Sequence, residues 1–447
     1  MKYEEYKDVN AGWINKIPSH WYTIPIKYTV KNPVTSFIDG DWIESKVIES
    51  DGIRYLTTGN VGVLEYKEQG SGFISEETFA KLNCTEVFPG DLLISRLNEP
   101  IARTCIVPDL GYRIVVAVDN VIYRPETSFY DKRFIMYQMN CSPYAENAFF
   151  IARGSTMPRI SRTMLGAIKL CVPPLSEQQA IATYLDEKCG EINRAIDVQK
   201  KKIDLLNELK QTIITDAVTK GLDPDIPMKD SGVEWIGEIP AHWEKMNMRF
   251  LISDYKAGPF GSSLITNNLL DDGDILVYTP EHIAKGETEL PNNLYLPNIR
   301  KEEMSQFVVN KGNILIPIVG SLGRAMIIEE DMPTGIINQR LAKFNLKKDM
   351  INPKYFLYYF AKSQISETYN ILNSRGSIIV NLTKQIIYDM PFVLPPLKEQ
   401  VIIVNYLDKK TAAIDIKIIK AERHIELLEE LKQSIITEAV TGKIKVC

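Results

Sequence analysis

Residues 173–188 read PPLSEQQAIATYLDEK, and residues 395–410 read PPLKEQVIIVNYLDKK. The similarity continues without a gap to LLNELKQTIITDAVT at 205–219 and LLEELKQSIITEAVT at 427–441. At this offset of 222, 25 of 47 positions are identical, which chance does not produce. Because repetition at a fixed period indicates a duplicated architecture, this pair of segments decides the fold prediction.

The same offset relates other parts of the chain. GWINKIPSHW at 12–21 aligns with EWIGEIPAHW at 234–243, and RGS at 153–155 aligns with RGS at 375–377. Two copies of this unit account for nearly all of the 447 residues. We therefore predict an internal tandem repeat with pseudo-twofold symmetry. Its parts are a first globular domain at 1–172, a helix at 173–220, a linker and second globular domain at 221–394, and a second helix at 395–447.

Both similar segments have the hydrophobic spacing of a coiled-coil helix, with apolar residues alternating at three and four positions. Pro174 and Pro396 precede the two segments, and Ser176 followed by Glu177 suits the start of a helix. The predicted seam consists of Leu185, Ile192, Ile196, Ile203, Leu206, Ile213, Leu407, Ile414, Ile418, Ile425, Leu428 and Ile435. A long helix with so narrow a seam needs a partner. We favour an antiparallel coiled coil of the two helices of one chain; homodimerisation through the helices is the alternative.

The two globular segments are predicted to be α+β, because short β-rich runs are punctuated by glycine and proline and a few helical stretches intervene. The expected strands are 53–57, 91–95, 104–107, 114–122, 275–279, 313–319 and 325–328. The expected helices are 132–141 and 353–364.

Composition places the chain among ordinary globular proteins, with 45% hydrophobic residues and a net charge of −5. No run of 18 apolar residues predicts a membrane helix, and the charged start MKYEEYKDVNAGW lacks the apolar region of a secretory signal. The six cysteines are scattered without a C-x-x-C pair, which favours free thiols and a cytoplasmic protein over a disulfide framework or a metal site.

Positive charge is concentrated locally. Residues 147–172 carry four basic residues and no acidic one, and residues 332–366 carry six basic residues and one acidic one. Such patches can meet phosphates, although a solvated lysine face explains the second patch as well. Glycine-containing loops at 256–264 and 319–324, and the loop 95–103, allow a close backbone approach and present side chains that can reach base edges. The candidate DNA contacts are Arg96, Asn98, Arg103, Arg153, Ser155, Arg159, Ser262, Ser263, Thr279, Arg324, Gln339, Arg375 and Ser377.

No catalytic constellation is evident. The sequence has no G-x-x-x-x-G-K-[ST], H-E-x-x-H or G-x-S-x-G motif, and no Asn/Asp-Pro-Pro-Tyr/Phe motif of adenine methyltransferases. Of the four histidines, His20 and His242 occupy the same repeat position beside a tryptophan, which favours packing over catalysis. We expect neither a catalytic residue nor a bound metal in this chain.

The duplicated helical segments, together with WIGEIPAHWE and GPFGSSL, resemble over essentially the full length the specificity subunit of type I restriction–modification enzymes. The resemblance implies two target recognition domains, each reading one half of a bipartite, asymmetric sequence in double-stranded DNA. It also implies that the helices form an antiparallel coil, set the distance between half-sites and dock two modification subunits. Those subunits use S-adenosylmethionine to methylate adenine, and restriction subunits that use ATP and Mg²⁺ join them.

Two other classes of function stay open from the residues alone. One is a coiled-coil scaffold whose two heads bind proteins, and the other is a standalone enzyme, which the absent motifs disfavour. Sequence-specific DNA binding that requires both heads would separate the first prediction from these two.

Overall fold

The structure, a computed structural model, describes residues 2–70, 72–154, 156–259, 264, 269–300, 302–320, 323–373 and 382–446. The chain divides into two compact units, residues 1–199 with 423–447 and residues 200–422. Each unit contains one globular head and a part of each long helix. The division therefore cuts both helices, and the domain boundaries predicted from the sequence stay a prediction.

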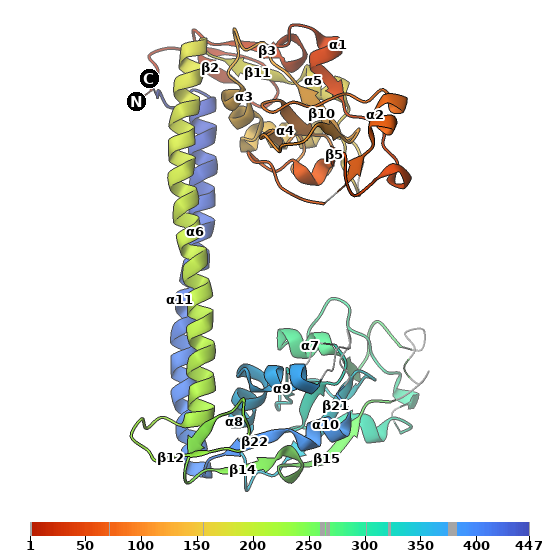
Figure 1. Cartoon of the computed structure of the whole chain (residues 1–447), viewed down its shortest axis with the longest axis vertical. Coiled ribbons are helices and arrows are strands. Elements are labelled where there is room, and N and C mark those ends of the chain that lie inside the picture. The colour runs from red at the N-terminus through yellow and green to blue at the C-terminus, as the bar shows by residue number, and fades with distance from the viewer. Residues whose placement is uncertain are drawn as a thin grey trace. The chain divides into compact units, whose positions relative to one another are not determined.

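Two long helices follow the two Pro-Pro pairs, α6 (Leu175–Lys220) and α11 (Leu397–Val440). In the first unit Lys432 Nζ donates to Asn193 Oδ1 at 2.8 Å, and in the second Lys210 Nζ pairs with Asp415 Oδ1 at 2.6 Å. Both contacts have the same antiparallel register. In each unit the end of one helix therefore lies beside the start of the other, and the predicted antiparallel pairing is confirmed (Figure 1).

The predicted seam positions lie inside this helix pair. Leu185, Ile192, Ile196, Leu407 and Ile414 are buried, and the other seven are half-buried. Toward the C-terminal end of each helix the most buried face shifts by one residue, because the helix there packs into the core of a head as well as against its partner. The residues that are fully or nearly fully buried there are Ile214, Ala217, Val218, Ile436, Ala439 and Val440.

The first head is built on two sheets, a hairpin and a strand pair. An antiparallel sheet has the order β4 (Phe37–Asp39), β10 (Asn120–Tyr123), β7 (Leu92–Ser95) and β8 (Thr104–Ile106). A second sheet has the order β6 (Phe73–Ile74), β5 (Ile53–Leu56) and β9 (Ile114–Val116), and β5 and β9 are parallel. The hairpin is β1 (Tyr6–Asp8) and β2 (Lys16–Pro18), and β3 (Tyr22–Pro25) pairs with β11 (Lys169–Val172). The helices are α1 (Pro33–Ser36), α2 (Glu76–Leu82), α3 (Lys132–Met139), α4 (Ser142–Ile151) and α5 (Arg162–Ala167).

The second head repeats this topology with one difference, because the third strand of its smaller sheet lies beside the counterpart of β9 rather than beside that of β5. Its antiparallel sheet has the order β15 (Ile252–Ala257), β21 (Leu341–Leu346), β18 (Ile314–Pro317) and β19 (Met326–Ile327). Its other sheet has the order β16 (Leu276–Tyr278), β20 (Gly335–Ile337) and β17 (Val308–Val309), with β16 and β20 parallel. The hairpin is β12 (Met228–Asp230) and β13 (Glu238–Pro240), and β14 (Glu244–Asn247) pairs with β22 (Pro391–Leu394). The helices are α7 (Pro280–Lys285), α8 (Pro353–Leu357), α9 (Ile365–Asn373) and α10 (Lys384–Asp389). The α+β prediction and the tandem repeat are thus confirmed.

One predicted strand, 114–122, is wrong as a single element. It is two strands in different sheets, β9 and β10, with a turn at 117–119 between them. In both heads a glycine from another segment packs closely against this turn. A Cβ on Gly40 would lie 2.3 Å from the Val116 carbonyl oxygen, and a Cβ on Gly258 would lie 1.9 Å from the Asn338 carbonyl oxygen. Only glycine leaves room for the strand to pass so close to the turn.

The two heads differ in register by one residue at the helix after their main sheet. The I-P-x-H-W segments and the strands β7 and β18 are 222 apart, the stretch from β10 and β21 to Tyr137 and Tyr358 is 221 apart, and from the RGS segments onward the offset is 222 again. A short π-helix, Tyr358–Lys362, lies at this point in the second head. A π-turn accommodates one extra residue, so this insertion restores the register before α9.

The helix entry is the same in both units. Gln178 is buried, its carboxamide oxygen accepts from Asp131 N, and its nitrogen donates to the carbonyls of Phe129 and Pro173, all at 2.9 Å. Gln400 makes the matching three bonds at 2.7–2.9 Å. His20 Nε2 lies 2.8 Å from Glu177 Oε2, and His242 lies at the same distance from Glu399. The E-Q pairs and the I-P-x-H-W segments thus fix each head to the start of a helix.

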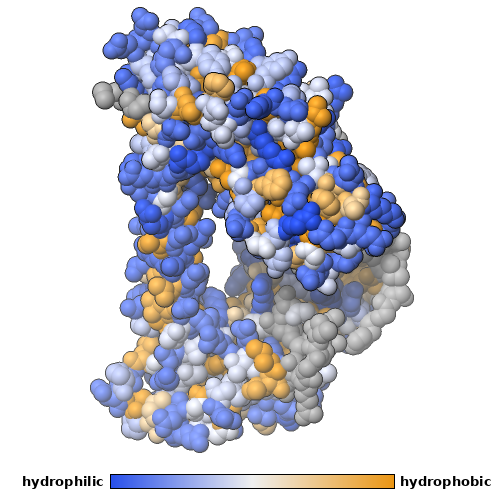
Figure 2. Space-filling model, turned by 45° about the horizontal axis from the view of Figure 1, so that its top comes forward, coloured by the Kyte–Doolittle hydropathy of each residue, from blue (hydrophilic) through white to orange (hydrophobic). Residues whose placement is uncertain are grey.

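The surface of the molecule is mainly hydrophilic on the face drawn in Figure 2, with hydrophobic side chains in small separate patches. Within the residues that the structure describes, no helix is long and apolar enough to cross a membrane.

Candidate nucleic-acid interface

In the first head, three loops meet at one edge of the main sheet. They are the β7–β8 loop, the turn 117–119 and the segment 152–161 between α4 and α5. Asn98 N donates to the Pro158 carbonyl at 3.1 Å, and Arg153 and Arg159 exchange backbone hydrogen bonds of 3.0 and 2.9 Å. These bonds hold together an open cavity of about 570 Å³ lined by Arg96, Arg153, Gly154, Arg159, Ser161 and Met164.

Arg96 lies beneath this surface. Its side chain is 7% exposed, donates to the Val118 carbonyl at 2.6 Å and pairs with Asp39 at 3.2 Å. Burial lowers the pKa of its guanidinium, but from a value so high that the group stays charged. Arg96 therefore stabilises the turn 117–119 from inside the head. This buried position disfavours the prediction that Arg96 contacts a base.

Arg103 is likewise engaged by the protein itself. Its guanidinium donates to five backbone carbonyls, at 2.7 Å to Val61, 2.8 Å to Thr58, 3.0 Å to Leu97 and 3.2 Å to both Asn98 and Pro100. Nε and Nη2 each bond one of these carbonyls, and the two hydrogens of Nη1 are shared among the other three. Arg103 thus shapes the β7–β8 loop, and a direct DNA contact by it stays a prediction that this geometry disfavours.

Arg153, Arg159 and Asn98 are exposed on the surface of this edge. Arg159 pairs with Asp119 at 2.6 Å, whereas Arg153 makes no ion pair with any residue that the structure describes. Asn98 has a left-handed backbone with φ of 62°, which asparagine tolerates better than most residues and which turns the loop outward. All three side chains are exposed where DNA could reach them, although Arg159 would have to share or leave its ion pair, and their contact with DNA stays a prediction.

In the second head the equivalent loops also come together. The backbone of Gly258 touches Asn338, and a Cβ on Gly320 would lie 3.0 Å from Arg340 Nη2. Gln339 and Arg340 form the exposed tip of the turn before β21, the counterpart of Val118 and Asp119. The structure thus brings Gln339 beside Gly258 and Arg340 beside Gly320.

The other two described predictions in this head have local protein partners. Arg324 is exposed and donates to the Ala284 carbonyl at 3.2 Å. Thr279 caps α7: its backbone nitrogen donates to His282 Nδ1 at 3.0 Å, and its hydroxyl lies 2.8 Å from the same atom. Thr279 therefore has a structural role, which makes it a poor candidate for reading bases. Five further predicted contacts lie outside the described residues, namely Ser155, Ser262, Ser263, Arg375 and Ser377.

Sequence reasoning left Arg340 out of the candidates. Arg340 is exposed at the tip of the turn. In the sequence, only its position within the basic stretch 332–366 pointed to it. An offset of 221 at β10 and β21, in place of the fixed offset of 222, makes Arg340 the counterpart of Asp119.

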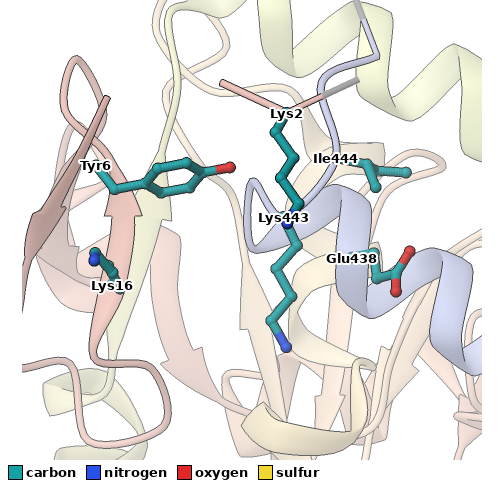
Figure 3. A pocket seen from close by; sticks show the side chains of 6 residues that line it. All are labelled: Lys2, Tyr6, Lys16, Glu438, Lys443 and Ile444. Carbon is teal, nitrogen blue, oxygen red and sulfur yellow. The ribbon is translucent and has the colours of Figure 1, made fainter. Parts of the chain in front are cut away.

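Another cavity, of about 720 Å³, lies where the hairpin β1–β2 meets the end of α11. Figure 3 shows Tyr6 and Lys16 on the hairpin side and Glu438 and Ile444 on the helix side, and Tyr6 Oη donates to the Gly442 carbonyl at 2.9 Å. Lys2 and Lys443 complete the lining. This arrangement holds a segment near the start of the chain against the segment that follows α11. Across the described ranges, no group of histidine, cysteine or acidic residues is placed to hold a metal ion.

Comparison with known proteins gives consistent matches. The sequence model described as "Type I restriction modification DNA specificity domain" matches residues 36–208 and again residues 259–427. The putative type I restriction enzyme MjaX specificity subunit of Methanocaldococcus jannaschii is 25% identical over 453 residues, covering 100% of this chain and 98% of that protein. The type I restriction enzyme EcoBI specificity subunit of Escherichia coli is 26% identical, covering 80% of this chain and 74% of that protein.

The fold matches a solved structure as well. A chain from the work described as the structural basis of complex assembly and conformational transition of the type I R-M system has a TM-score of 0.69 at 15% identity. The match covers 96% of this chain and 100% of that one.

Proposed function

Because the chain belongs to the family of type I restriction–modification specificity subunits, with two DNA specificity domains, we propose that each head reads one half of a bipartite, asymmetric DNA sequence. The observation that carries this proposal is the repeated loop edge. Both heads hold the turn before β10 or β21 in the same way, through Arg96 N donating to the Asp119 carbonyl and Ile318 N donating to the Arg340 carbonyl, both at 2.9 Å. The side chains at the tip of this turn differ: Val118 and Asp119 in one head, Gln339 and Arg340 in the other. One scaffold with different tips suits two different half-sites.

Reading would combine phosphate contacts with base contacts. Exposed cations such as Arg153 would fix each head on the backbone, and Gln339 and Arg340 have the side chains that pair bidentately with adenine and guanine in the major groove. Each good base contact contributes about 1–3 kcal/mol of discrimination. Two modest half-sites held in one chain bind with a high effective concentration, so together they specify one long target.

The two helices would set the distance between the half-sites and dock two methyltransferase subunits. A helix rises 1.5 Å per residue and is stiff, so a helical pair is a suitable spacer. The net charge of −5 on this chain favours a complex in which partner subunits neutralise much of the DNA backbone. Restriction subunits would join the same complex, and we place it in the cytoplasm with its DNA.

The chain itself would be non-catalytic. S-adenosylmethionine, ATP and Mg²⁺ would be bound by the partner subunits, and the methyltransferase would flip its adenine out of the stack. This chain would position that event without performing it.

The test is to purify the chain alone and together with its methyltransferase subunit, and to map methylated adenines in host DNA by single-molecule sequencing. We expect no methylation by the chain alone and a single bipartite motif for the complex. A stable, active complex that methylates without any motif would instead support a scaffold whose heads bind proteins.

A further inference from the structure

A pair of large apolar residues is exposed at the same repeat position in both heads. Phe149 and Phe150, near the end of α4, are 47% and 89% exposed. At the offset of 222, Ile371 and Leu372, near the end of α9, are 65% and 58% exposed. The repeat therefore presents an apolar pair to solvent twice.

The helices that carry these pairs are equivalent in burial as well as in sequence position. Tyr144 and Ala148 of α4 are buried, and so are their counterparts Ser366 and Asn370 of α9. Both helices thus turn the same face toward the head and the same end outward. The four pair positions differ in identity between the heads but are all large and apolar, so what is retained is hydrophobic surface rather than a particular residue.

The first pair lies beside the proposed reading surface. Phe149 and Phe150 line an open cavity of about 540 Å³ together with Glu99, Pro100 and Ile101 of the β7–β8 loop. A partner seated here would lie next to the half-site that this head reads. A methyltransferase subunit must reach an adenine in that half-site, so its position beside the loop is the one that the reaction requires.

The charge around the pairs argues for a protein partner and against DNA. Glu146 precedes Phe150 by one helical turn, and both Glu146 and Glu99 line the same cavity. Glu367 is exposed one turn before Ile371. Carboxylates beside an apolar pair repel phosphates but attract lysine and arginine, so the complementary surface is apolar with a basic rim.

We propose, resting on the proposed function, that Phe149–Phe150 and Ile371–Leu372 each dock one copy of the methyltransferase subunit. Two copies of one partner need two similar surfaces, and this duplicated chain supplies them. One pair covers far less than the roughly 800 Å² per partner that a stable interface buries. Each pair therefore acts as an anchor within a larger contact, in the manner of an interface hot spot.

The experiment uses the full chain with two double variants, F149S/F150S and I371S/L372S. Titration with the methyltransferase subunit, followed by native mass spectrometry, counts the bound copies and gives both affinities. Each double variant should weaken one of the two binding steps by at least about tenfold, the loss expected for a hot spot, and leave the other unchanged. The unfolding midpoint should not fall, because the altered side chains are exposed.

Matched controls are V34S and I299S, which remove exposed apolar residues that are 81% and 92% exposed. Their repeat counterparts are the charged residues Lys256 and Glu77, so neither belongs to a duplicated apolar pair. Both controls should bind two subunits with unchanged affinity.

Unchanged affinity in both double variants would overturn the docking role. If the double variants bind the subunit with unchanged affinity but weaken DNA binding by the complex, the docking role is also overturned. The apolar pairs would then contact DNA directly. If the unaltered chain binds no methyltransferase subunit, the proposed function fails first, and the docking role fails with it.

Discussion

Replacing Arg103 by lysine separates a loop-shaping role from a phosphate contact. The guanidinium satisfies five carbonyl oxygens on the β7–β8 loop and the neighbouring segment 58–61. A lysine ammonium keeps the charge but has only three donors, so at least two carbonyls lose their partner. The Asn98 and Pro100 carbonyls are exposed and can bond water instead, so the cost comes from the part-buried carbonyls of Val61, Thr58 and Leu97. At about 1–3 kcal/mol for each of the one or two that lysine leaves unsatisfied, the cost is roughly 1–5 kcal/mol.

The assay has two readouts, urea unfolding of the chain and methylation by the assembled complex on targets altered in one half-site at a time. We expect Arg103→Lys to lower the unfolding free energy and to relax recognition of the half-site read by the first head only. Arg113→Lys is the control, because Arg113 is an exposed residue that forms ion pairs with Glu76 and Glu86. Wild-type stability and recognition in Arg103→Lys would refute the reasoning, since charge alone would then suffice.

Three further predictions follow from the described contacts. Gln178→Ala should lower the unfolding free energy by roughly 2–5 kcal/mol, because three backbone groups at buried or part-buried bonds lose their partner. Gln179→Ala on the exposed side of α6 should change the unfolding free energy in urea by less than about 0.5 kcal/mol. Burial lowers the pKa of His282, so the unfolded chain binds this proton more readily. The unfolding free energy should therefore fall as the pH drops below about 6.5. Urea titrations at pH 7 and 5.5 measure this fall. It should be smaller in His282→Gln than in the unaltered chain, whereas the control His424→Gln should show the full fall. Arg340→Ala should weaken binding of the complex by about 10- to 100-fold on targets with an intact second half-site and hardly at all on targets that lack it.

The helices and the repeat could be predicted because they depend on local spacing and on duplication, both visible in one sequence. The seam from Leu185 to Ile196 follows the heptad pattern. The shift to Ile214 and Ile436 at the helix ends was not predictable, since it depends on the head cores that the helices enter. The break of 114–122 into two strands was missed because seven of its nine residues are apolar, which hid the turn at Asp119 and Asn120, and because the turn packs against Gly40 far away in the sequence.

The candidate site was less predictable than the fold. Residue type alone suggested Arg96, Arg103 and Thr279, but their polar groups are taken by neighbouring protein atoms. Whether a cation faces solvent or a carbonyl depends on tertiary packing, which composition and spacing do not report. Arg340 was missed because its place at a loop tip follows from the sheet topology rather than from a motif.

The most direct test of the central claim is to map methylated motifs for two variants of the assembled complex. R153A/R159A alters the loop edge of the first head, and Q339A/R340A alters that of the second. We predict that each variant relaxes one half of the bipartite motif and leaves the other half and the spacer length unchanged. Relaxation of both halves together, or an unchanged motif in both variants, would contradict the assignment of one half-site to each head.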